Sequence, residues 1–102
     1  MLGIDSELMF LLDTARGNAN IPFIITSGLR TPAQSVAVGG YVNDPHTKGL
    51  AVDILCLNDT DQLSIVFGAK MAGFKRIGLG KSHVHLDIDS SLPQNVLFIE
   101  NQ

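Results

Sequence analysis

All three histidines of this 102-residue chain lie in two short segments that also hold aspartates. His46 and Asp53 belong to the segment PHTKGLAVD, and His83, His85 and Asp87 belong to the segment SHVHLD. Imidazole nitrogens and carboxylate oxygens bind zinc, and they also accept and return protons near neutral pH. The two segments are therefore the first candidates for a metal or proton-transfer site.

The first segment joins a loop to an apolar strand. Gly49 permits the chain to turn back between His46 and Asp53, so that both side chains reach one point. Asp53 is the one carboxylate in the apolar run LAVDILCL, residues 50–57, which predicts a buried strand. Burying a carboxylate is costly unless it is paired or binds a metal, so Asp53 needs an explanation.

The second segment predicts a strand with one polar face. The two-residue period of a strand sends His83, His85 and Asp87 to one face and their apolar neighbours to the other. Taken singly, each residue is better explained as an ordinary hydrogen-bonded side chain. Taken together, the two segments offer the three protein ligands of a catalytic zinc site, in which a water takes the fourth position.

Helices and strands that position these segments are predicted from apolar spacing. A helix is expected over residues 4–15, capped by Asp5 or Ser6 and ending near Gly17. A second helix, over residues 59–72, is expected to begin at Asp59 or Thr60, to end at Gly73, and to bury Leu63, Val66, Phe67 and Met71.

Strands are expected at residues 22–26, buried on both faces, and at residues 50–57. Two short strands within residues 76–89 are separated by residues 80–82, and residues 96–99 form a last edge strand. Residues 27–49 are rich in glycine and proline and predict a loop, of a length that is usually functional or disordered. The strands are too closely spaced for regular crossovers, which predicts an α+β fold with a largely antiparallel sheet.

Composition favours one globular domain, with 45% hydrophobic and 17% charged residues. The net charge of −3 and the lack of a basic run argue against nucleic acid as a partner, and no apolar run is long enough for a membrane span. The single cysteine, Cys56, excludes an intrachain disulfide and is expected in the core, which leaves a metal as the available cross-link. The sequence does not indicate an oligomeric state.

Five motifs, in order over about residues 24–89, resemble the zinc peptidases of the M15 family: SGLRTP, AVGG, HTKGLAVD, GLG and HVHLD. This family includes D-alanyl-D-alanine carboxypeptidases and phage endolysins that cleave peptidoglycan. The resemblance implies that residues 1–102 form one catalytic domain with the α+β Hedgehog/DD-peptidase fold. It also implies a zinc ion held by His46, Asp53 and His85.

The resemblance implies further roles for residues around this zinc site. Many members carry a glutamate or aspartate three residues before the last ligand as general base, and this position is Ser82 here. Proton transfer is therefore assigned to His83 or Asp87, with His83 preferred, while Asp87 has orientation of a histidine as a second role. Arg30 is expected to bind a carboxylate of the substrate or the developing oxyanion.

The function that the resemblance implies is hydrolysis of an amide bond in the D-amino-acid-containing stem peptide of bacterial peptidoglycan, by a carboxypeptidase or an endopeptidase. The alternative is a non-catalytic binding module of the same fold, stapled by zinc, and Ser82 is its best support. The opening residues lack the features of a signal peptide. We therefore expect a phage or prophage lysin that acts on the cell wall, or a protein that stays in the cytoplasm until it is released.

Overall fold

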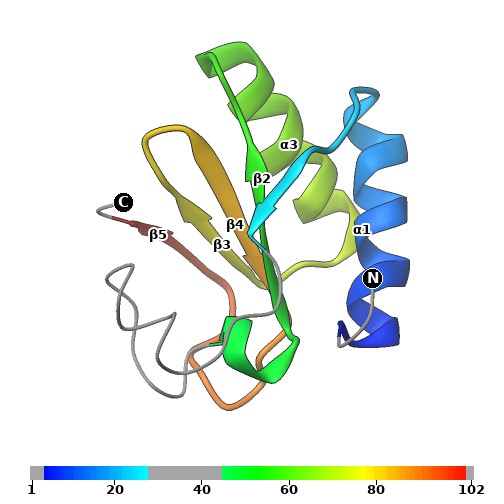
Figure 1. Cartoon of the computed structure of the whole chain (residues 1–102), viewed down its shortest axis with the longest axis vertical. Coiled ribbons are helices and arrows are strands. Elements are labelled where there is room, and N and C mark those ends of the chain that lie inside the picture. Colours follow the sequence, from blue (N-terminus) through cyan, green and yellow to red (C-terminus); the bar gives the residue numbers. More distant parts are fainter. Residues whose placement is uncertain (1–3, 28–44, 101–102) are drawn as a thin grey trace.

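The computed structural model describes residues 4–27 and 45–100. Its elements, in chain order, are α1 (Ser6–Ala19), β1 (Ile25–Ser27), the 3-10 helix η1 (Pro45–Lys48), β2 (Ala51–Leu55), α3 (Asp59–Ala72), β3 (Arg76–Leu79), β4 (His83–Asp87) and β5 (Val96–Ile99). The strands form one sheet in the order β1-β2-β4-β3-β5, in which all neighbours are antiparallel except β3 and β5. The predicted α+β class with a largely antiparallel sheet is confirmed (Figure 1).

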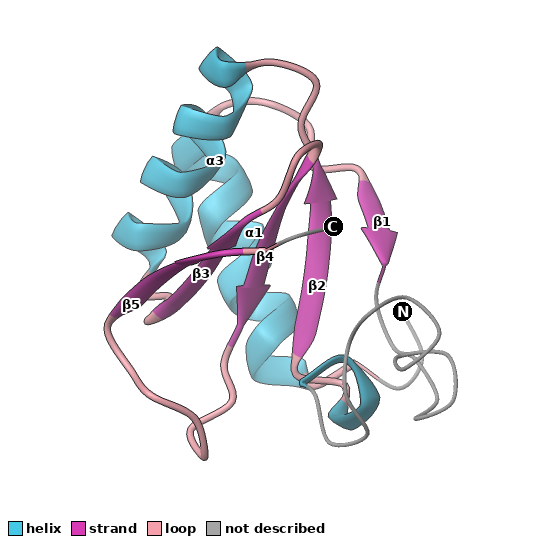
Figure 2. Ribbon diagram, turned by 90° about the vertical axis from the view of Figure 1, so that its left-hand side faces the viewer, coloured by secondary structure: helices cyan, strands magenta, loops and turns pink. Residues whose placement is uncertain are grey.

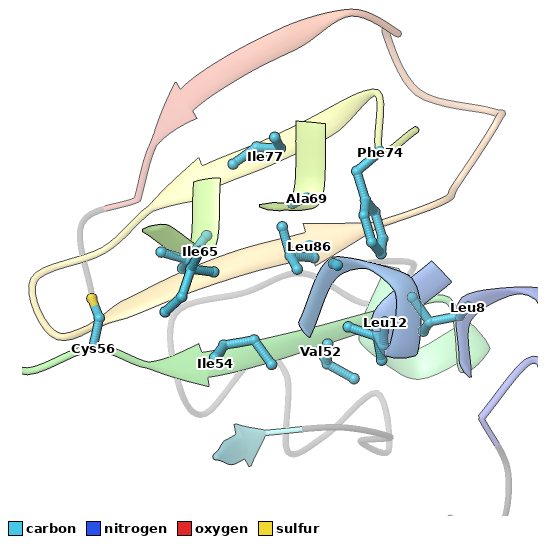
Figure 3. Close-up of a cluster of buried hydrophobic side chains, with 12 residues drawn as sticks. Leu8, Leu12, Val52, Ile54, Cys56, Ile65, Ala69, Phe74, Ile77 and Leu86 are labelled. Carbon is cyan, nitrogen blue, oxygen red and sulfur yellow. The ribbon is translucent and has the colours of Figure 1, made fainter. Parts of the chain in front are cut away.

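Helices α1 and α3 pack against each other and cover one face of this sheet (Figures 1 and 2). The hydrophobic core fills the space between the two layers (Figure 3). Its largest fully buried apolar side chains come from both helices, from two strands and from the turn after α3: Leu8, Val52, Ile54, Ile65, Phe74, Val84 and Leu86. Since side chains alternate along a strand, the residues between these apolar ones on β2 and β4 face away from the helices.

Helix α1 is longer than the predicted residues 4–15. Asp5 caps its beginning, as expected, and its carboxylate accepts hydrogen bonds from two first-turn amides. The helix ends at Ala19, two residues beyond the predicted end near Gly17, and its C-cap Asn20 adopts a left-handed conformation with φ 59°. The backbone N–H of Asn20 donates to the carbonyl of Arg16 and thereby closes the last turn.

Helix α3 covers the predicted residues 59–72 and ends at Gly73, whose φ of 111° is left-handed, as expected. Its N-cap is Asn58 rather than one of the two residues that follow. The Asn58 side chain accepts a hydrogen bond from the backbone N–H of Asp61 at 2.8 Å. The error is one residue, because asparagine and aspartate are equally good N-caps.

The predicted buried face of α3 is wrong. Three of the four residues expected in the core are 70%, 56% and 66% exposed: Leu63, Phe67 and Met71. The buried residues of this helix are Ile65, Gly68 and Ala69. A Cβ at Gly68 would collide with the backbone of Ala15 on α1, so small residues set the close approach of the two helices. Close packing of helix backbones, rather than apolar side-chain volume, decides which face of α3 is buried.

The first strand also differs from its prediction over residues 22–26. Strand β1 begins only at Ile25, and Ile24 is 58% exposed, so this segment is not buried on both faces. The reason is its place at the edge of the sheet, where β2 is its neighbour and the register is irregular. Strand β2 is shorter than the predicted residues 50–57, since it ends before the exposed Leu57.

The remaining predicted strands are confirmed. Strands β3 and β4 divide residues 76–89 as expected, and β5 lies at the other edge of the sheet. Cys56 is buried in the core. No helix among residues 4–27 and 45–100 is long and apolar enough to cross a membrane.

Candidate metal centre

The sheet brings four residues into one row on the face opposite the helices. Asp53 of β2 is opposite His85 of β4, His85 is opposite Gly78 of β3, and Gly78 is opposite Phe98 of β5. A Cβ at Gly78 would collide with the ring of Phe98, so the glycine makes room for this ring. The Phe98 ring lies beside His85, with 5.6 Å between ring centroids, and thus supports its imidazole from one side.

His46 reaches this row from η1, the short helix before β2. The backbone N–H of Leu50 donates to the carbonyl of Pro45 at 3.0 Å, which closes the turn around His46. Gly49 has a left-handed φ of 74°, a conformation that favours glycine, so it allows the reversal that was predicted for it. The reversal places the buried His46 beside Asp53.

An ion pair between the exposed Lys48 and the buried Asp89 ties η1 to the segment after β4. Lys48 Nζ lies 2.8 Å from Asp89 Oδ2, and Asp89 also accepts hydrogen bonds from the backbone N–H and the hydroxyl of Ser91. Burial raises the pKa of Asp89, but the hydrogen bonds from Lys48 and Ser91 lower it by a larger amount. The pKa of Asp89 is therefore below its ordinary value. Sequence reasoning missed Asp89, although it continues the two-residue alternation of His85 and Asp87.

Three ligand atoms converge at the end of this row: His46 Nε2, Asp53 Oδ1 and His85 Nδ1. They are separated by 3.2 Å between the two histidines, 3.3 Å between His46 and Asp53, and 3.1 Å between His85 and Asp53. A zinc ion bound tetrahedrally at its usual ligand distances holds its ligand atoms about 3.3 Å apart. Two imidazole nitrogens and one carboxylate oxygen are also a donor set that suits zinc, so these residues fit the ion.

Hydrogen bonds fix the ring of His85 in the orientation that this site requires. Its Nε2 donates to Asp87 Oδ2 at 2.6 Å, which leaves Nδ1 directed at Asp53. The other oxygen of Asp87 accepts from Arg76 Nε at 2.8 Å and from the backbone N–H of Asp89 at 3.1 Å. Asp87 is fully buried and both of its oxygens are engaged, so it is placed to orient His85 rather than to take a proton from a water.

Without a metal, the neighbouring groups of the cluster shift the pKa values of Asp53 and His85. Burial raises the pKa of Asp53, but hydrogen bonds and charge from His46 and His85 lower it far below its ordinary range. Burial lowers the pKa of His85, whereas its hydrogen bonds to Asp53 and Asp87 raise it to about 9. A proton thus occupies the cluster at neutral pH when no metal is bound, and a cation is the natural replacement for it.

A second pair lies next to the three ligand atoms. His83 Nε2 is 2.7 Å from Glu100 Oε1, and Glu100 Oε2 is 3.7 Å from His85 Nδ1. The hydrogen bond to Glu100 raises the pKa of His83 above its ordinary value, although burial opposes this. Sequence reasoning missed Glu100, because it follows an apolar strand far from both motifs and only the pairing of β5 with β3 brings it here.

The structure therefore brings together His46, Asp53, His83, His85 and Asp87 of the residues predicted for the site. Arg30, the predicted substrate ligand, lies outside the described residues. Its assignment stays a prediction from the sequence.

Comparison with known proteins identifies the family. No curated protein matches the chain. A family model described as Peptidase M15 matches residues 2–89, which include all three residues of the converging ligand set and the pair His83 and Asp87. Glu100 lies beyond the matched residues. The chain belongs to the Peptidase M15 family.

Proposed function

We propose that this protein is a zinc-dependent peptidase in which His46, Asp53 and His85 hold the metal. The observation that carries the proposal is the mutual separation of the three ligand atoms, 3.1–3.3 Å, which is the spacing of a tetrahedral zinc site. Membership of a peptidase family supports the reaction class.

When bound at such a site, zinc lowers the pKa of a water towards about 7 and polarises the carbonyl of the scissile amide. The protein supplies the rest of the chemistry. His46 Nε2, His85 Nδ1 and a carboxylate oxygen of Asp53 would hold the metal, and Asp87 accepts the hydrogen bond of His85 Nε2, which directs Nδ1 to the metal side.

Proton transfer is proposed for the side of the site occupied by His83. Of the two residues that the sequence offered for this role, Asp87 is engaged by Arg76 and His85, whereas His83 is hydrogen-bonded to a partly exposed carboxylate. This placement supports proton transfer on the side of the site that holds His83 and its carboxylate partner, and it supports orientation of His85 as the role of Asp87. Arg30 is proposed to bind a carboxylate of the substrate or the oxyanion that develops during attack.

The proposed substrate is the D-amino-acid-containing stem peptide of bacterial peptidoglycan, cut either at its end or internally. Its support is the resemblance to carboxypeptidases and endolysins together with the Peptidase M15 match. Action on the cell wall as a phage or prophage lysin is the biological setting that this substrate implies.

The proposal is tested with purified peptidoglycan fragments. Zinc-loaded protein and a chelated sample are incubated with the fragments, and the products are analysed by mass spectrometry. We expect new products in the zinc-loaded sample alone, and the mass that is lost identifies the bond that is cut. If folded, zinc-loaded protein yields no product from any fragment, the proposed substrate is wrong.

A second candidate function is a binding module that uses zinc only as a staple. Two observations favour it, namely Ser82 at the position of the usual acidic residue and the deep burial of the three ligand residues. A structural zinc has four protein ligands, whereas a catalytic zinc keeps one exchangeable position. We therefore expect acetohydroxamate to bind the zinc-loaded protein. Failure to bind would favour the module.

A further inference from the structure

Glu100 is held next to the metal centre by the end of the sheet. Its backbone N–H donates to the carbonyl of Leu79 at 2.8 Å, which extends the pairing of β5 with β3 by one residue. Phe98 and Glu100 are two residues apart, and both contact His85, so they lie on the metal-centre face. Leu97 and Ile99 alternate with them and are exposed. Strand pairing and side-chain alternation thus place Glu100 on the face that carries the ligands.

The spacing between Glu100 and His83 is that of a hydrogen bond rather than that of two ligands of a second metal ion. Asp53, His83 and Glu100 could hold an ion by proximity alone. However, His83 Nε2 and Glu100 Oε1 are only 2.7 Å apart, which is a short hydrogen bond and well below the about 3.3 Å between two ligands of one zinc ion. The atoms of the metal centre keep that larger separation, so the two groups differ in kind.

The direction of this hydrogen bond determines which oxygen of Glu100 is available. The Nε2–H group of His83 donates a hydrogen bond to Oε1, since a carboxylate oxygen accepts. The second oxygen, Oε2, lies 3.7 Å from His85 Nδ1 and thus beside the ligand atoms. The carboxylate of Glu100 is also 21% exposed, in contrast to the fully buried Asp87. Glu100 therefore has one oxygen in a short hydrogen bond to His83 and a second oxygen that lies beside the ligand atoms at a longer distance.

Gly80 leaves the space that the imidazole ring of His83 occupies. A Cβ at this position would collide with the imidazole ring of His83. The backbone N–H of Gly80 donates to the carbonyl of His83 at 2.9 Å, which closes the turn between β3 and β4. The His83 ring is therefore seated by a residue without a side chain, and its Nε2 is directed at Glu100.

We propose that Glu100 is the general base of this peptidase and that His83 is a positioning residue that holds it. This inference rests on the proposed function and fills the role left open by Ser82. Oε2 takes one proton from the attacking water as the water oxygen bonds to the carbonyl carbon. When the C–N bond breaks, the electron pair leaves with the nitrogen, which receives this proton from Glu100, and the acid product keeps the other hydrogen.

The first test measures turnover and metal content of Glu100→Gln in the zinc-loaded full chain. Glutamine has the same shape but cannot take the proton, so we expect kcat to fall by about 100- to 10,000-fold with KM little changed. Zinc content should stay at the wild-type value. Glu7→Gln, which changes an exposed glutamate on α1, is the matched control and should keep wild-type turnover. Wild-type turnover in Glu100→Gln would overturn the proposal, and so would loss of zinc, which would make Glu100 a ligand.

The second test does not depend on the substrate. When acetohydroxamic acid binds a metal as its anion, a carboxylate beside the metal can take the proton that the acid loses and hold it in a hydrogen bond to the bound anion. We expect calorimetry to show about 10- to 100-fold weaker acetohydroxamate binding to zinc-loaded Glu100→Gln than to the wild type. Equal affinity would overturn the role of Glu100. Weaker binding by the variant, without peptidoglycan products from the wild type, would leave Glu100 as the base and reject the substrate alone.

His83 is tested by a conservative replacement. His83→Gln retains an N–H donor that can reach Glu100, whereas His83→Ala does not. We expect both variants to keep zinc and KM, and His83→Gln to recover part of the kcat that His83→Ala loses. Equal kcat in the two variants would show that His83 does not act by holding Glu100.

Discussion

At the residue scale, the centre depends on carboxylates that fix imidazole rings. Asp87 holds the Nε2 proton of His85, and this choice leaves Nδ1 for the metal side. Arg76 compensates the charge of Asp87 and also stacks on Phe98, with 5.0 Å between its guanidinium carbon and the ring centroid. Such outer contacts orient the ligands before any ion binds, so the centre is organised in advance.

Replacement of one ligand should show how far zinc binding stabilises the fold. His46→Ala removes one of three ligands, so we expect it to lose zinc and the stability that zinc adds. At free zinc of about 100 times the wild-type Kd, this stability is about 2.7 kcal/mol. Metal analysis and thermal melting with and without zinc measure both effects. A His46→Ala variant that melts in zinc at the wild-type temperature would contradict the assignment.

His83→Ala is the matched control for this ligand replacement, because His83 lies outside the three converging ligands. It should bind zinc as the wild type does. If His83→Ala loses zinc while His85→Ala keeps it, the roles of these two histidines are exchanged.

The pKa of His85 predicts a pH dependence of the metal-free protein. The folded pKa is about 9, above the ordinary 6.5, so the stability gained from protonated His85 is fully present below pH 6.5. It is lost as the pH rises through about 9, at no more than about 1.4 kcal/mol per pH unit. Zinc replaces this proton, so the apparent affinity of the protein for zinc should rise as the pH increases towards about 9. Urea unfolding with chelator, and zinc titrations, measure the two trends; a flat stability curve would contradict the charge state of His85.

Much of the ligand set could be predicted at the residue scale, and the reason is spacing. His83, His85 and Asp87 share a face because a strand alternates, and Gly49 marks the reversal that brings in His46. Glu100 could not be found in this way. Its position depends on which strands pair at the sheet edge, and this long-range choice leaves no local pattern in the sequence.

At the scale of elements, the contact between α1 and α3 depends on small residues. Gly68 faces the backbone of Ala15 and Ala19, where no side chain fits. The apolar stripe of α3 suggested a different buried face, because spacing shows which residues share a face but not how closely two backbones approach. The element ranges of α3, β3, β4 and β5 followed from local patterns, whereas the strand order and the parallel pairing of β5 did not.

Two glycine replacements should therefore have opposite effects on stability. Gly68→Ala would force α1 and α3 apart, and we expect a loss of about 1–3 kcal/mol in the free energy of unfolding. Gly17→Ala is the control within α1, where a Cβ meets no atom within 4 Å. Alanine is the better helix former, so this variant should gain up to about 1 kcal/mol. Urea denaturation measures both values; equal effects would show that helix propensity, and not the interhelical contact, governs Gly68.

At the scale of the whole molecule, the centre joins parts of the chain that are distant in sequence. His46 comes from η1, Asp53 from β2 and His85 from β4, and Lys48 with Asp89 ties η1 to the chain after β4. A metal bound there cross-links the sheet without any disulfide, since Cys56 is the only cysteine. In a small domain such a cross-link couples metal binding to folding. With a metal bound, the same centre would serve both the stability of the fold and its proposed chemistry.

The most direct measurement of the central claim is a zinc titration of turnover. Metal-free protein is loaded stepwise with zinc, and bound zinc and peptidoglycan products are measured at each step. The proposed centre predicts that turnover rises in proportion to bound zinc and saturates at one ion per chain, and that His46→Ala stays inactive throughout. Product formation by metal-free protein would contradict a catalytic zinc at His46, Asp53 and His85. Protein that binds one zinc ion per chain and shows no turnover would contradict it too.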